Sequence, residues 1–117
     1  MTSLIACLST GKGTWAQLIK LINEQNWERI ILITNNFGKE KFSCQKKVEF
    51  VVIDPEKPIN EIVKTIKPGI SGITDLEVAL NLTSGTGKEH MAILSAVISS
   101  GLGFRLVECS ETGLIEL

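Results

Sequence analysis

The stretch NLTSGTGKEHM, residues 81–91, gathers groups able to bind an anion between two apolar runs of the chain. Its hydroxyl, amide and ammonium groups can all donate hydrogen bonds; they belong to Asn81, Thr83, Ser84, Thr86 and Lys88. Two glycines, Gly85 and Gly87, let a ligand approach the backbone closely. A phosphate suits this set, because the start of a helix also offers unpaired N–H groups. The stretch therefore predicts a phosphate-binding loop in which these seven residues contact the ligand.

The same stretch departs from a P-loop at two positions. Walker A requires a glycine five places before the glycine of the Gly-Lys pair, and Leu82 stands there. It also requires serine or threonine after the lysine, and Glu89 follows Lys88. A P-loop ATPase is excluded, whereas the chemistry of an anion site remains.

A second polar loop, STGKGT, occupies residues 9–14 and leads into an apolar helical pattern. Its hydroxyls, glycines and lysine predict a second set of phosphate ligands: Ser9, Thr10, Gly11 and Lys12. Gly11, Gly13 and Ala16 also fit the dinucleotide fingerprint G-x-G-x-x-A. That fingerprint expects an acidic residue near the end of the next strand, but residues 35–36 are both asparagine. A nicotinamide cofactor is therefore not expected.

Short continuous apolar runs alternate with helical patterns along the chain. The runs predict buried strands at 4–8, 29–34, 48–53, 76–82 and 104–109, and a short last strand at 114–117. The helical spacing predicts helices from the N-cap Thr14 to about Gln25, from Ile59 to Pro68-Gly69, and over 88–100. The polar, basic residues 35–47 are expected to form an exposed connection. Trp15 and Trp27 are interpreted as packing residues.

This alternation predicts one α/β domain over residues 1–117, three-layered and Rossmann-like, with a mainly parallel sheet of about six strands. The last two strands are joined by only a few residues, so we expect them to form a C-terminal antiparallel pair. Ligands of such sheets bind at the carboxyl ends of the strands, where the strand order reverses. The first and fourth strands are neighbours in this order. The loops 9–14 and 83–88 should therefore lie side by side.

Composition limits the classes of protein to which the chain can belong. The 117 residues carry a net charge of −1, which argues against a nucleic-acid binder with a basic face. The three cysteines are odd in number and far apart, as is typical of a reducing compartment. The sequence has no metal-ligand spacing, signal peptide or membrane span. We therefore expect a cytoplasmic protein that needs no metal or cofactor and binds neither duplex nucleic acid nor membrane.

The two polar loops together resemble those of the CARF family, the CRISPR-associated Rossmann fold. The family signature has a strand ending in N-x-T, then S/G-G-T, a lysine, a methionine and an apolar helix of small residues. The matching positions here are Asn81, Thr83, Ser84, Gly85, Thr86, Lys88 and Met91, and Ser9-Thr10-Gly11 matches the hydroxyl-rich loop after strand one. The usual form places the lysine directly after G-T. This chain inserts Gly87 there and has His90 before the methionine.

The resemblance implies a standalone sensor in CRISPR-linked antiviral defence. CARF domains form homodimers that bind cyclic oligoadenylate across the two-fold axis, and a separate effector protein would then respond to the ligand. A symmetric ring suits a symmetric pair of subunits, each supplying the same two loops. The apolar helix 88–100 could bury part of its surface in such a dimer. A mononucleotide or other phosphate monoester is an unrelated alternative ligand.

The resemblance also leaves open an enzyme, a metal-independent ring nuclease acting on the same ligand. The ribose 2′-hydroxyl would attack the adjacent phosphorus and leave a 2′,3′-cyclic phosphate, while the protein stabilises charge on the phosphorane oxygens. Lys88 would be the charge stabiliser and Ser9 would position the phosphate or ribose. His90 is two residues beyond Lys88, so a helix would turn it away by about 200°. We therefore expect His90 at the surface or an interface.

Overall fold

A computed structural model describes residues 2–9 and 12–117, apart from the side chain of Lys12. The strands in this part of the chain are β1 (Leu4–Cys7), β2 (Ile30–Thr34), β3 (Glu49–Val52), β4 (Glu77–Asn81), β5 (Gly103–Ser110) and β6 (Gly113–Glu116). The helices are the 3-10 turn η1 (Lys12–Thr14), α1 (Trp15–Asn23), α2 (Asn36–Lys41), α3 (Ile59–Gly69) and α4 (Gly87–Ser99). None of the described helices is long and apolar enough to cross a lipid bilayer.

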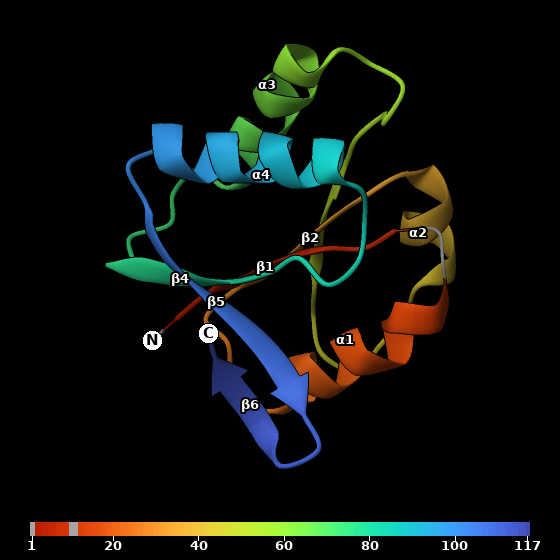
Figure 1. Ribbon diagram of the computed structural model, residues 1–117, viewed down its shortest axis with the longest axis vertical. Helices are drawn as coiled ribbons and strands as arrows, with labels where there is room; N and C mark the ends of the chain where they lie inside the picture. Colours follow the sequence, from red (N-terminus) through yellow and green to blue (C-terminus); the bar gives the residue numbers. More distant parts are fainter. Residues whose placement is uncertain (1, 10–11) are drawn as a thin grey trace.

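The six strands form one sheet in the order β3-β2-β1-β4-β5-β6. Neighbouring strands are parallel from β3 to β5, and β6 runs antiparallel to β5. The helices α3 and α4 cover one face of the sheet, and α1 and α2 cover the other (Figure 1). The predicted Rossmann-like three-layer architecture is confirmed, and the strand order reverses between β1 and β4.

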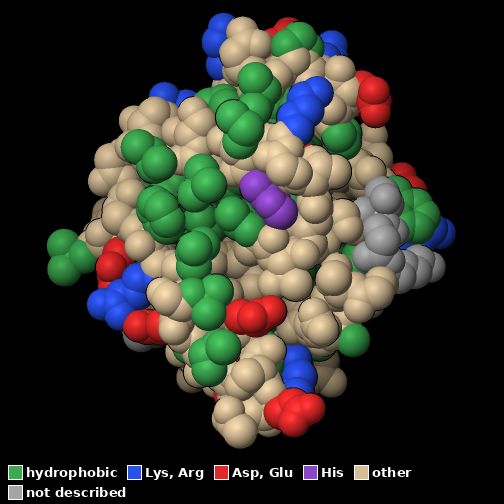
Figure 2. Space-filling model, viewed as in Figure 1, with side chains coloured by type: hydrophobic (Ala, Val, Ile, Leu, Met, Phe, Trp, Pro, Cys, Tyr) green, Lys and Arg blue, Asp and Glu red, His purple; other side chains and the backbone are tan. Residues whose placement is uncertain are grey.

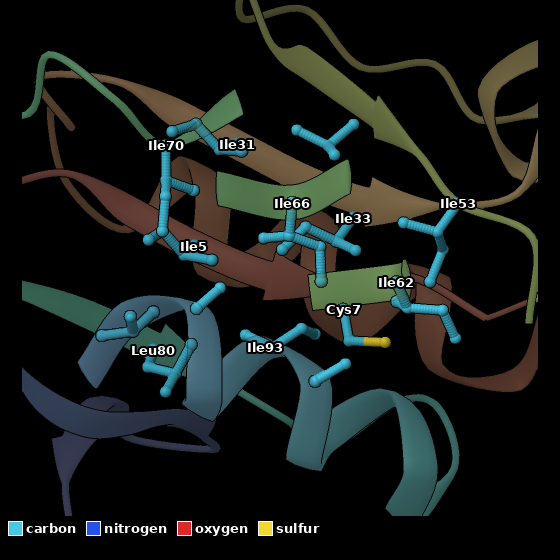
Figure 3. Packing of buried hydrophobic residues seen from close by; sticks show 14 of the residues in the cluster. Ile5, Cys7, Ile31, Ile33, Ile53, Ile62, Ile66, Ile70, Leu80 and Ile93 are labelled. Carbon is cyan, nitrogen blue, oxygen red and sulfur yellow. The ribbon is translucent and has the colours of Figure 1, made fainter. Parts of the chain in front are cut away.

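The unbroken apolar run of β1 follows from its central place between the two helical layers. Ile5 and Cys7 lie in the core beneath α3 and α4, as Figure 3 shows, and both are at most 1% exposed. Leu4 and Ala6 point to the opposite face and pack in the core beneath α1. Both faces of the strand are therefore dry, which explains why its residues do not alternate between apolar and polar.

The C-terminal hairpin closes one edge of the sheet. The guanidinium of Arg105 on β5 pairs with both Glu77 on β4 and Glu116 on β6. These exposed ion pairs join three adjacent strands across the sheet surface.

A short helix corrects the expectation that residues 35–47 form only an exposed connection. The side chain of Asn35 accepts a hydrogen bond of 3.0 Å from the Gly38 N–H and caps α2. Gly38 packs so closely on β2 that a Cβ there would come within 1.9 Å of the Thr34 hydroxyl oxygen. With only six residues, α2 is too short to show a convincing apolar period.

The start and end of the first helix also differ from the sequence prediction. Thr14 was expected to cap the helix, but its side chain makes no capping hydrogen bond. Its backbone is already helical, with φ −100° and ψ −3°, because the 3-10 turn η1 leads directly into α1. An N-cap residue needs an extended backbone instead. The helix ends at Asn23, two residues before Gln25.

Candidate anion site at the carboxyl edge of the sheet

Two serines join the loops after β1 and β4. The strands are neighbours, with Leu4 opposite Ala79, so both loops leave the same edge of the sheet. The Ser9 N–H donates to Ser84 Oγ at 2.8 Å, and Ser84 Oγ donates to Ser9 Oγ at 2.7 Å. Ser84 is only 6% exposed and serves as the buried support. Because Ser84 supplies the hydrogen of the hydroxyl pair, Ser9 keeps its own O–H to donate to a ligand.

Two aromatic N–H groups fix the backbone of the same two serines. Trp15 Nε1 donates to the Ser9 carbonyl at 2.8 Å, and His90 Nε2 lies 2.8 Å from the Ser84 carbonyl. A carbonyl can only accept, so His90 Nε2 carries the hydrogen. We expected His90 at the surface or an interface, and neither of these two anchoring roles was predicted from the sequence. The side chain of His90 leans toward the helix N-terminus, as helical side chains do, and so reaches back to the loop.

A capping box begins α4 directly after the loop. The Thr86 side chain accepts from the Glu89 N–H at 3.2 Å, and Glu89 Oε1 accepts from the Thr86 N–H at 2.8 Å. The Glu89 carboxylate is 6% exposed and turned inward. The carboxylate therefore holds the loop from the inside through its hydrogen bond with the Thr86 N–H, and it does not point out to solvent. The Thr86 hydroxyl oxygen already accepts a hydrogen bond within the protein, so its first role is to cap α4 and hold the loop in place.

Asn81 also stabilises the loop from within the protein. Its Nδ2 donates to the Val107 carbonyl at 2.8 Å and to Thr83 Oγ1 at 3.2 Å. The residue is 6% exposed, whereas Thr83 is exposed. Asn81 thus holds β4 to β5 and orients Thr83, which is the side chain that solvent or a ligand can reach.

Lys88 is exposed on the first turn of α4 and extends toward the loop after β3. Its ammonium donates to the Pro55 carbonyl at 2.8 Å. An ammonium has three hydrogens, so two remain for an anion in this position. The contact joins the start of α4, which follows β4, to the segment after β3, three strands away in the sheet.

The structure brings the two predicted loops together, as expected from the strand order. Ser9, Ser84 and the start of α4 share one edge, and Gly87 has open space around it. The predictions for Thr10, Gly11 and the side chain of Lys12 fall outside the described residues. Within the described chain, no group of three or more His, Cys, Asp or Glu side chains could hold a metal ion.

The buried thiol of Cys7 lies directly beneath this loop. Burial, reinforced by the Glu89 carboxylate, raises the pKa of Cys7 to about 12. An unfolded cysteine has a pKa near 8.5, so folding favours the neutral thiol. The resulting stabilisation is complete below about pH 8.5 and is lost as the pH rises toward 12.

We therefore expect the free energy of unfolding to fall above pH 9 more steeply in the wild type than in Cys7→Ala. The difference in slope approaches about 1.4 kcal/mol per pH unit, the linkage limit for one proton. Urea denaturation from pH 8 to 10.5 measures it, and all groups other than Cys7 cancel in the comparison. Parallel pH profiles for the two proteins would contradict the assignment.

An apolar outer face of α4 lies next to the site. We define it by Met91 and Ile98, which are 64% and 61% exposed, with the half-buried Leu94 between them. Figure 2 shows hydrophobic side chains gathered beside the single histidine on this side of the molecule. The opposite side of α4 is buried in the core through Ala92, Ile93, Ala96 and Val97. The helix therefore has two apolar sides. One side packs in the core of this chain, and the other is exposed.

A small hollow lies beneath the loop after β4, between α1 and β5. The hollow lined by Thr83 and Ser84 has a volume of about 10 Å³. Small-molecule pockets usually measure roughly 300–1,000 Å³. This hollow is therefore too small for a ligand larger than a water molecule.

Comparison with known proteins supports the architecture. The structure of Enterococcus italicus Csm6 bound to cyclic hexa-2'-fluoro-hexa-dAMP is similar, with a TM-score of 0.56 and 14% sequence identity over 94% of this chain. This chain spans 34% of the length of that Csm6 chain. No protein-family profile and no curated protein sequence matches. At this identity the likeness shows the fold alone, and the Rossmann-like fold expected from the sequence is confirmed.

Proposed function

We propose that this chain is a CARF-type sensor that binds a cyclic oligoadenylate across the two-fold axis of a homodimer. The observation that carries the proposal is the Ser9–Ser84 pair, which joins the two loops into one hydroxyl-bearing edge. The likeness to Csm6, whose structure holds a cyclic oligonucleotide, supports this choice of ligand. The sensing role belongs to CRISPR-linked antiviral defence, with a separate effector protein as the responder.

The donors at this edge suit the phosphodiester groups of such a ring. Ser9 offers its O–H, Thr83 is exposed beside it, and Lys88 has two N–H groups beyond its contact with Pro55. The backbone N–H groups at the start of α4 add donors and a favourable dipole. Glu89 points inward, where its Oε1 accepts from the Thr86 N–H, so its carboxylate does not occupy a ligand position at this edge.

A second copy of the chain would cover the exposed outer face of α4 and would double the number of groups that bind the ligand. The apolar outer face of α4 is exposed in one subunit. Pairing two copies through Met91 and Ile98 would bury this face and bring two serine pairs to one side of the dimer. A ring with matching symmetry would then contact the same groups twice.

The direct test is incubation of the chain with cyclic tetra- and hexa-adenylate in EDTA, followed by native gels and denaturing chromatography. An intact ligand bound as one ring per two chains supports the sensor. Linear products would instead support a metal-independent ring nuclease, the second candidate, in which Ser9 keeps a free O–H to position the reacting phosphate. Absence of ring binding, with AMP bound once per chain, would refute both and favour a mononucleotide site.

Replacing Lys88 with alanine should weaken ring binding by at least about a hundredfold. A charge-assisted hydrogen bond contributes about 1.5–3 kcal/mol, and the change occurs twice in a dimer. Lys20→Ala is the matched control, because this lysine is exposed on the last turn of α1 and removes the same charge. Titration at two salt concentrations measures both effects. An equal loss in the two variants would mean that Lys88 acts only through net charge.

A further inference from the structure

A hollow lies at the amino edge of the sheet, opposite the edge that carries the serine pair. It opens where α3 and α4 end, since α3 leads to the start of β4 and α4 leads to the start of β5 (Figure 1). Its volume is about 500 Å³. We call it the α3–α4 hollow and define it by Lys64, Lys67, Ile70, Ile73, Ser100 and Leu102. The function proposed above assigns no role to it.

The α3–α4 hollow has an apolar floor and a positively charged rim. Ile70 is 1% exposed, and Ile73 and Leu102 are half-buried and pack on the core. Lys64 and Lys67 are exposed on α3 at the rim. No ion pair between described residues uses either ammonium. The hollow therefore suits an apolar side chain that is flanked by carboxylates.

An apolar side chain of this kind projects beside the hollow. Leu76 is 97% exposed, whereas the other exposed large hydrophobic residues of the described chain range from 38% to 77%. A Cβ on Gly103 would lie 3.1 Å from the Leu76 carbonyl oxygen, so Leu76 is next to Leu102 in the hollow wall. Asp75 and Glu77 stand on either side of it in the sequence. This short segment therefore carries the two kinds of group that the hollow suits.

The backbone on both sides of Leu76 is held in place. Asp75 Oδ2 accepts a hydrogen bond of 2.7 Å from the N–H of Ser3, which is 1% exposed. Glu77 pairs with Arg105, which also pairs with a second carboxylate on β6, so the segment keeps negative charge. Because Leu76 is presented by a fixed backbone, a partner that buries it pays little for ordering the chain.

We propose that the amino edge is a self-association surface, in which Leu76 of each copy enters the α3–α4 hollow of the other. The leucine and the hollow lie side by side, so two copies that face each other about a two-fold axis make the same contact twice. The carboxylates beside each leucine then approach the lysines at the rim of the other copy, which favours a second copy over an uncharged apolar partner. The contact uses none of the outer face of α4 and goes beyond the proposed function.

We expect this contact to be weak. One leucine and one hollow from each copy make a small interface, and interfaces below about 1,200 Å² form transient complexes. Single chains should therefore pair only near millimolar concentration and stay separate at the micromolar concentrations used for ligand binding. Where two copies are already joined through α4, as proposed above, the amino edges should link such dimers into longer assemblies at high concentration.

The test uses Met91→Glu, which removes pairing through α4, at concentrations up to millimolar. Sedimentation equilibrium should show association that stops at two chains. Adding Leu76→Ala should weaken it at least about a hundredfold, because each pair loses two buried leucine side chains. Ser100→Trp fills the hollow from its exposed rim and should act alike. Asn60→Trp is the control, since Asn60 is exposed on α3 outside the hollow, and thermal unfolding checks that all variants fold.

NMR locates the contact and separates it from the proposed function. Dilution of Met91→Glu should shift the amide signals of Gly72 and Leu76 and leave that of Ser84 unchanged. Absence of ring binding in the wild type would refute the sensor and leave this inference standing. Association that persists in both amino-edge variants, or a chain that stays monomeric at millimolar concentration, would overturn it. Hollow signals that shift with a peptide of residues 73–78 but not on dilution would also overturn it, and would assign the hollow to an acidic segment of another protein.

Discussion

Replacing Gly85 with alanine will lower the free energy of unfolding by about 2–4 kcal/mol, the sum of backbone strain and overpacking. Gly85 has a φ of +106°, which side-chain-bearing residues rarely adopt. A Cβ there would lie 2.5 Å from Cys7 Sγ, far inside van der Waals contact. The loop must shift to relieve this contact, and Ser84 would move with it away from Ser9. We therefore expect ring binding to be lost as well.

The glycine two residues later provides the matched control. Gly87 is the first residue of α4 and has nothing within 4 Å of a Cβ, so Gly87→Ala should be neutral or slightly stabilising. Urea denaturation measures both variants. Adding Cys7→Ala to Gly85→Ala should recover part of the loss, because it removes the atom in conflict. Equal stability of the two glycine variants would show that the loop has space the structure does not indicate.

The difference between Gly85 and Gly87 shows which features of the site can be predicted from the sequence and which need the structure. Both glycines were predicted to let a ligand approach, but only the structure shows that Gly85 faces the core thiol of Cys7. The meeting of the two loops was predictable, because it follows from strand order. The hydrogen bonds of the serine pair were not, because they join residues 75 positions apart through side-chain geometry.

The capping box of α4 and the short helix α2 differ in how clearly the local sequence predicts them. Thr86-Gly-Lys-Glu89 has the spacing of a capping box, so the inward turn of Glu89 was readable from the chain. The helix α2 was missed because six residues rich in charge carry no apolar period. The cleft of about 820 Å³ that α2 lines together with the end of β3 and with α3 was therefore also hidden.

Replacing Met91 with glutamate is expected to convert a dimer into monomers and to reduce ring binding at least about a hundredfold. Met91 is 64% exposed on the outer face of α4, so the change leaves the core untouched. A glutamate buried in a symmetric interface would place an unpaired charge there twice. Sedimentation velocity would report a fall to the 12.8 kDa of one chain. Binding falls because each monomer offers half the donors, without the gain from joining two sites.

Two further variants, one on each helical layer, show whether the outer face of α4 forms the dimer interface. Ile98→Glu changes the same face and should act alike, whereas Asn23→Glu adds the same charge on α1, across the sheet (Figure 1). A ring that bridges two copies must also stabilise their association, because it binds the dimer alone. Adding cyclic hexa-adenylate should therefore shift any wild-type monomer toward the dimer, saturating at one ring per two chains. A monomer that saturates with one ring per chain would exclude a ligand held on a two-fold axis.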